Sequence, residues 1–98
     1  MQIRFKDKKL ERFWETGLHD GTHPDSVLKR VLALIAMLHN APDIRRLYAF
    51  KGLHFEKLAG DRKGQHSLRL NRRLRLVVEI CAVPRPTTIY IIGIEDYH

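Results

Sequence analysis

The residues best suited to acid–base chemistry lie at the end of the chain, which closes on Asp96, Tyr97 and His98. A histidine exchanges a proton near neutral pH, a tyrosine hydroxyl can donate one, and a carboxylate can orient a histidine or act as a base. His54 offers a second imidazole, although an ordinary strand position would explain it equally well. With an arginine on the phosphate, these groups could cleave RNA without a metal, by attack of a ribose 2′-hydroxyl.

Positive charge is concentrated in the middle of the chain. Residues 45–75 contain ten lysines and arginines against only two acids, Glu56 and Asp61, whereas the net charge of the whole protein is +7. A basic block beside a nearly neutral remainder is typical of a protein that binds a polyanion, although a solvated surface would also explain it. Arginines in such a block can hold a scissile phosphate and stabilise the charge that develops on it.

Length and composition limit the organisation of the chain. Ninety-eight residues with 44% apolar content can build one core, so we expect a single domain over residues 1–98. No apolar run is long enough for a membrane span, and the first residues lack the apolar middle of a signal peptide; both predict a cytoplasmic protein. The single Cys81 agrees with a reducing compartment. The histidines lack the paired spacing of zinc ligands, so we expect no metal and no cofactor.

Two helices are expected in the first half of the chain. Asp7 can cap a helix whose apolar face would consist of Leu10, Phe13, Trp14 and Leu18. A second helix is expected from about Pro24, a residue that suits the first turn, and Asn40 and Pro42 should end it. Its apolar stripe should pack on a sheet.

Apolar patterns predict five strands, at residues 2–6, 53–58, 65–70, 74–80 and 88–94. The order predicts an α+β domain in which two N-terminal helices pack on a curved, largely antiparallel sheet of four or five strands. The last strand is apolar on both faces, so we expect it inside the sheet, where it would deliver the terminal tripeptide to the turn that precedes the fourth strand.

Alternation also predicts the register between strands. An odd-numbered loop near residues 71–73 would set Arg69 opposite Arg75, and the same reasoning across the next turn would set Gly93 opposite Arg75. That register would also pair Leu76 with Ile92, Val78 with Tyr90 and Leu74 with Ile94. Two facing arginines destabilise a sheet by roughly 0.2–1 kcal/mol, so we expect a phosphate or a carboxylate beside them.

Several motifs carry a resemblance to a known family. These are Leu53-His54, the run from Lys57 to Asn71 that contains Gly-Asp-Arg-Lys-Gly, Arg75-Leu76, and the closing Glu95-Asp96-Tyr97-His98. They resemble the HigB branch of the RelE/ParE toxins, the plasmid-maintenance killer proteins, over essentially the whole chain. The resemblance implies a RelE-like fold and a type II toxin that inhibits translation as a ribosome-dependent mRNA endonuclease. It also implies a HigA-type antitoxin with a helix-turn-helix domain, through which alone operator DNA would be contacted.

The resemblance further assigns residues by position. The family's catalytic residues correspond to His54, Asp96, Tyr97 and His98, and its phosphate-stabilising arginine to Arg75. The residues that would face mRNA or ribosomal RNA are Lys57, Arg62, Lys63, Arg69, Arg72 and Arg73. The chain departs from the family at three positions, because the family usually has an aromatic residue at His66 and Leu74 and often a lysine at Ala59.

Two other functions are compatible with the same fold. ParE-like relatives inhibit DNA gyrase and are not nucleases, and such an inhibitor needs no proton shuttle. A plain RNA-binding module would hold phosphates on its basic face with steep salt dependence and yield no product. The combination of His54 with the terminal Asp-Tyr-His favours the nuclease.

Overall fold

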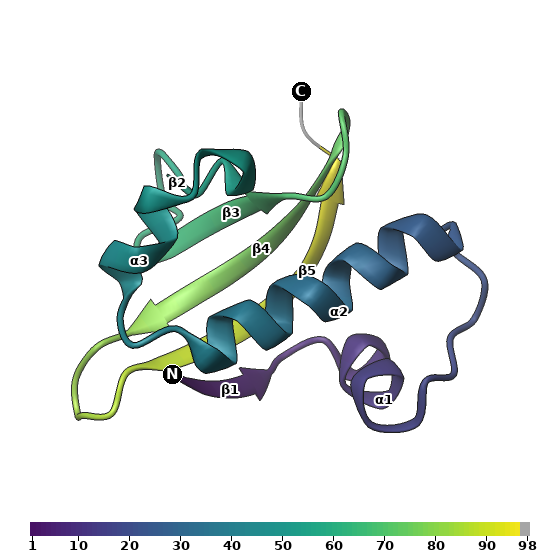
Figure 1. Ribbon diagram of the computed structural model, residues 1–98, viewed down its shortest axis with the longest axis horizontal. Helices are drawn as coiled ribbons and strands as arrows, with labels where there is room; N and C mark the ends of the chain where they lie inside the picture. Colours follow the sequence, from purple (N-terminus) through teal and green to yellow (C-terminus); the bar gives the residue numbers. More distant parts are fainter. Residues whose placement is uncertain (97–98) are drawn as a thin grey trace.

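The computed structural model describes residues 1–96 (Figure 1). The elements in this range are β1 (Gln2–Phe5), α1 (Lys8–Thr16), α2 (Asp25–Asn40), α3 (Ile44–Ala49), the 3-10 turn η1 (Lys51–Leu53), β2 (Glu56–Lys57), β3 (Gln65–Arg69), β4 (Leu74–Cys81) and β5 (Thr88–Asp96). The strands form one sheet in the order β1-β5-β4-β3-β2. Because β1 is parallel to β5 and the other neighbours are antiparallel, the sheet is mixed, with β5 in its interior as predicted.

The first two helices begin where the sequence predicted them. The Asp7 carboxylate caps α1 by accepting a hydrogen bond from the Leu10 backbone N–H at 3.0 Å, and Gly17 ends this helix in the left-handed conformation at φ 75°. Pro24 directly precedes the first residue of α2. The predicted apolar face of α1 is only partly correct, since Leu10 is buried whereas Leu18 is 63% exposed.

The expectation of two helices was wrong, because the described residues contain a third, α3. The Asp43 side chain caps it, accepting a hydrogen bond from the Arg45 N–H at 3.0 Å, and Leu47 packs into the core with no exposed surface. Six residues give too short a periodic pattern to separate from a loop, so the sequence indicates only the end of α2 at Pro42.

The predicted strand at residues 53–58 was also largely wrong. Leu53 ends η1, and His54 then adopts the left-handed conformation, with φ 47° and ψ 50°. An extended strand cannot pass through such a residue, so only Glu56 and Lys57 pair with β3. The consequence is that His54 lies at a sharp turn beside the sheet.

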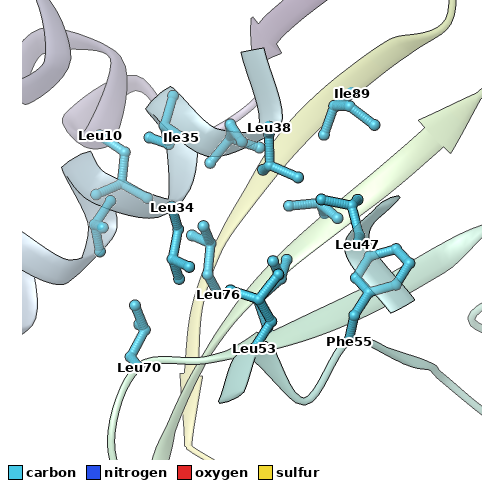
Figure 2. Close-up of a cluster of buried hydrophobic side chains, with 14 of the residues drawn as sticks. Leu10, Leu34, Ile35, Leu38, Leu47, Leu53, Phe55, Leu70, Leu76 and Ile89 are labelled. Carbon is cyan, nitrogen blue, oxygen red and sulfur yellow. The ribbon is translucent and has the colours of Figure 1, made fainter. Parts of the chain in front are cut away.

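The core lies between α2 and one face of the sheet, which we call the inner face (Figures 1 and 2). Leu34, Ile35 and Leu38 of α2 are fully buried and belong to the same cluster as Leu76 of β4. The core extends under α3 and η1 through Leu47, Leu53 and Phe55. Each fully buried leucine contributes about 1.5–3 kcal/mol to the free energy of folding by leaving water, so the contact with α2 stabilises the sheet. We call the opposite face of the sheet, which α2 does not cover, the outer face.

The registers of the two hairpins differ in how well they were predicted. Arg69 lies opposite Arg75, as expected. Between β4 and β5 the expected register was wrong, because Arg75 pairs with Glu95 and not with Gly93, and Leu76 pairs with Ile94. Two offsets of one residue add up to this shift. Next to the β4–β5 turn Val78 already pairs with Ile91 and not with the expected Tyr90, and a β-bulge between the pairs Val78–Ile91 and Val77–Gly93 leaves Ile92 as an extra residue in β5.

Candidate active site

A row of charged residues crosses the outer face at one end of the sheet. Arg69 of β3, Arg75 of β4 and Glu95 of β5 are successive partners across the three strands. We call the first two the arginine row. The carboxylate that the sequence led us to expect beside two facing arginines is therefore Glu95.

His54 joins this row from the turn after η1. The Arg75 Nη1 group donates to the His54 carbonyl oxygen at 3.2 Å, and Arg69 Nη1 lies 3.3 Å from His54 Nε2. Because a guanidinium can only donate, this second contact is a hydrogen bond only when Nε2 is unprotonated and the ring proton is on Nδ1. The contacts thus place an exposed imidazole at the arginine row, with its Nε2 facing the Arg69 guanidinium.

Arg30 of α2 supports the same corner and was missed by the sequence analysis. Its Nε donates to the Arg69 carbonyl oxygen at 3.4 Å, and its Nη2 approaches the Gly52 carbonyl oxygen at 3.5 Å. Arg30 therefore links the end of β3 to η1, which positions His54. No local pattern marks a single arginine on a helix for this role, since both contacts are with backbone far away in sequence.

Arg62 lies on the loop before β3 and binds Glu95. Its Nη1 and Nη2 donate to the two carboxylate oxygens at 2.7 and 2.5 Å, and its Nε donates to Gln65 Oε1 at 3.0 Å. These hydrogen bonds from Arg62 lower the pKa of Glu95, so the carboxylate is ionised at neutral pH. Arg62 was expected to face RNA, but its guanidinium is directed at a carboxylate.

The β3–β4 turn and the end of β5 line a second part of the site. Asn71 Oδ1 accepts from the backbone N–H groups of Arg73 and Leu74 at 2.9 and 2.7 Å, which shapes the turn. Arg73 Nη2 contacts Asp96 Oδ2 at 3.2 Å in an exposed ion pair. An open cavity of about 670 Å³ is lined by Thr22, His23, Pro24, Asn71, Arg72, Arg73, Leu74, Ile94 and Asp96. His23 is a further imidazole at this cavity, and its sequence context gave no signal for it.

The other predicted site residues are less closely grouped. Lys57 is exposed on β2, opposite His66, and Lys63 is exposed in the loop before β3. Tyr97 and His98 lie outside the described residues.

His66 lies where an aromatic residue was expected from the resemblance, and its imidazole takes part in an aromatic stack. Its ring stacks on Phe55 with centroids 4.7 Å apart, and burial lowers its pKa. A buried ring that prefers the neutral form, packed on a core residue, is a structural histidine.

The described residues contain no cluster of three or more histidine, cysteine or acidic side chains arranged to bind a metal ion. No helix within residues 1–96 is long and apolar enough to cross a bilayer.

The fold is similar to that of solved toxin structures. The YoeB/ParE toxin from Agrobacterium tumefaciens is similar in fold, with a TM-score of 0.60 and 15% identity, and both chains are covered completely. The YoeB–YefM complex from Staphylococcus aureus gives a TM-score of 0.60 with 19% identity, covering 100% of this chain and 97% of the other. The fold is therefore that of the RelE/YoeB-like toxins, an α+β fold with a mixed sheet.

Sequence comparison identifies the branch. Residues 3–91 match the model of the HigB-like family, described as the RelE-like toxin of the type II toxin–antitoxin system HigB. Toxin HigB-1 from Vibrio cholerae serotype O1 is 33% identical over 79 residues, which cover 81% of this chain and 83% of that protein. The chain belongs to the HigB-like toxins of type II toxin–antitoxin systems, so an antitoxin is among its partners.

Proposed function

We propose that this toxin is an endoribonuclease that cleaves mRNA on translating ribosomes in the cytoplasm. The observation that carries the proposal is the contact of His54 with the arginine row, through its imidazole to Arg69 and through its carbonyl oxygen to Arg75. An acid–base group beside two guanidinium groups matches the needs of a reaction in which a proton leaves a ribose hydroxyl while charge grows on a phosphate. Inhibition of another enzyme by surface binding would not require this arrangement.

The proposed reaction is attack of the 2′-hydroxyl on the adjacent phosphorus. His54 or His98 removes the 2′ proton, the bond from 2′ oxygen to phosphorus forms, and the bond from phosphorus to the 5′ oxygen breaks. The other histidine protonates the leaving 5′ oxygen, which gives a 2′,3′-cyclic phosphate and a free 5′ hydroxyl. Asp96 orients the acid–base pair, and Tyr97 donates a hydrogen bond or stacks on a base.

The arginine row supplies the electrostatic part of the mechanism. Arg75, assisted by Arg69, binds the non-bridging phosphate oxygens, which become more negative in the transition state. The hydrogen bond from Arg75 to the His54 carbonyl fixes that guanidinium against the turn that carries the base. The phosphate-binding arginine and the base are thus held next to each other, which favours in-line attack of the 2′-hydroxyl on the phosphorus.

The basic surface around this unit would hold the RNA strand. Arg72 and Arg73 line the cavity at the β3–β4 turn, while Lys57 and Lys63 extend the positive surface along the edge of the sheet. We assign these residues to phosphates of mRNA or ribosomal RNA. The antitoxin partner is proposed to be of the HigA type, with a helix-turn-helix domain through which the complex contacts operator DNA.

Mapping mRNA 5′ ends after brief expression in translating cells tests the proposal. Wild-type protein should produce new 5′ ends inside coding sequences, and His54→Ala should reduce them by about 10²-fold or more, as loss of an acid–base group does. His39→Ala is a matched control, because it removes an exposed imidazole from the end of α2. Growth arrest with inhibited gyrase and intact mRNA would refute the nuclease proposal. Binding of RNA without any cleavage product would refute it as well.

A further inference from the structure

Glu95 lies next to the arginines that would bind a phosphate in the proposed mechanism. Glu95 pairs with Arg75 across β4 and β5, and Arg75 pairs with Arg69 across β3 and β4. A carboxylate and a phosphate present similar pairs of acceptor oxygens to a guanidinium, so they compete for the same donors. A free Glu95 side chain beside the arginine row would therefore oppose substrate binding.

Arg62 holds the Glu95 carboxylate in a fixed position. Each carboxylate oxygen receives one N–H from Arg62, at 2.7 and 2.5 Å, and the third guanidinium nitrogen, Nε, donates to Gln65. The two side chains retain only 39% and 41% of their exposure. Arg62 thus uses every nitrogen of its guanidinium on the protein itself.

The path of the Arg62 side chain follows from these contacts. Gln65 and Glu95 belong to two outer-face rows of the sheet, and the row of Ser67 and Val77 lies between them. Since Arg62 contacts a residue of each flanking row, its side chain crosses the row in the middle. Ser67 and Val77 are each only 1% exposed, as expected of positions beneath a covering segment.

The loop that carries Arg62 is itself fixed by backbone hydrogen bonds. The Arg62 carbonyl oxygen accepts from the Gln65 N–H at 3.0 Å, and the Gly64 carbonyl oxygen accepts from the Ile80 N–H of β4 at 3.0 Å. The position of the guanidinium is therefore set by the fold and does not depend on bound RNA.

We propose that Arg62 is a positioning residue that holds the Glu95 carboxylate away from competition with the substrate phosphate for the arginine row. This inference rests on the proposed function. It gives Arg62 a different task from that of the neighbouring Lys63, which lies exposed on the same loop and is assigned to RNA. Because Arg62 acts through Glu95, the activity that is lost when Arg62 is replaced should return when the charge of Glu95 is also removed.

Cleavage of mRNA by purified protein on translating ribosomes tests this inference with six proteins. These are wild type, Arg62→Ala, Glu95→Gln, the double variant of both, Lys63→Ala, and Lys63→Ala combined with Glu95→Gln. Arg62→Ala should lower the single-turnover rate about tenfold, because it exposes one negative charge within a few ångströms of the phosphate. Adding Glu95→Gln should return the rate to within about threefold of wild type. In the Lys63→Ala background, Glu95→Gln should change the rate by no more than it changes wild type.

Two further measurements separate positioning from RNA contact and from folding. The slope of log Kd for RNA against log salt should stay unchanged in Arg62→Ala, whereas loss of a phosphate contact reduces it by about one. Arg62→Lys, which keeps the charge, should retain most activity, and urea midpoints verify that each variant is folded.

The outcomes are distinct. If wild type yields no product on ribosomes, the proposed function falls and takes this inference with it. Suppose that wild type cleaves, but that Glu95→Gln raises the cleavage rate of Arg62→Ala by the same factor as it raises the rate of wild type. This result, or a lower salt slope for RNA binding by Arg62→Ala, would overturn only the positioning role.

Discussion

Replacing His54 by alanine, glycine and asparagine should separate its chemistry from its backbone. The residue is exposed and adopts the left-handed conformation at φ 47°, ψ 50°. This conformation costs a residue with a Cβ about 1–2 kcal/mol, whereas glycine adopts it freely and asparagine tolerates it. All three variants lose the imidazole, so all three should lose cleavage by about 10²–10⁴-fold.

The stability of the same variants should differ in a predictable order. Glycine removes the strain of about 1–2 kcal/mol but gives about 0.4–1 kcal/mol of extra conformational entropy to the unfolded chain. The net expectation is that His54→Gly is more stable than His54→Ala by about 0.5–1 kcal/mol, with His54→Asn between them. Urea unfolding measures this order, and single-turnover cleavage of mRNA on ribosomes measures the chemistry.

Two results would refute this reasoning. Cleavage by His54→Ala at more than a tenth of the wild-type rate would remove His54 from the mechanism. Equal urea midpoints for the alanine and glycine variants would show that the left-handed turn exerts no strain. A loss of cleavage that followed the order of stability would assign the effect to folding.

Three more predictions concern the site and its support. Arg75→Ala should lower single-turnover cleavage by about 10²–10³-fold, as loss of a transition-state donor does, and Arg75→Lys should recover little because lysine cannot bind a phosphate bidentately. His66→Phe should raise the free energy of unfolding, measured in urea, by about 1–2 kcal/mol. The change removes the buried Nδ1, which has no hydrogen-bond partner within residues 1–96, and keeps an aromatic ring on Phe55. A lower urea midpoint would contradict this. Since Arg62 lowers the pKa of Glu95, that carboxylate stabilises the fold above its unfolded pKa of about 4.5 and this stability disappears as pH falls through the lower folded value. In Glu95→Gln the urea midpoint should therefore decrease less steeply below about pH 5 than in wild type. The difference should be modest because the Arg62–Glu95 pair is partly exposed, and an unchanged dependence of the midpoint on pH would contradict the prediction.

Sequence patterns predicted those elements whose signals are local. Asp7 and Pro24 marked the starts of α1 and α2, and the odd-numbered loop after β3 set Arg69 opposite Arg75. The left-handed turn at His54 and the contacts of Arg30 were missed, because both depend on packing against residues distant in sequence. The grouping of His54 with the arginine row was indicated only by family resemblance.

The bulge at Ile92 is the reason that an acidic residue lies in register with the arginine row. Near the β4–β5 turn the pairs are Ile80–Ile89 and Glu79–Tyr90, and continuing that register without a bulge would set Ile94 opposite Arg75. The extra residue advances β5 by one position, which brings Glu95 there. Because side chains alternate between faces, the same step returns Ile94 to the inner face. One inserted residue thus keeps Ile94 in the core and brings Glu95 into register with the arginine row, where Arg62 binds its carboxylate. The charge balance of the site is therefore set by backbone geometry, which strand alternation in the sequence does not encode.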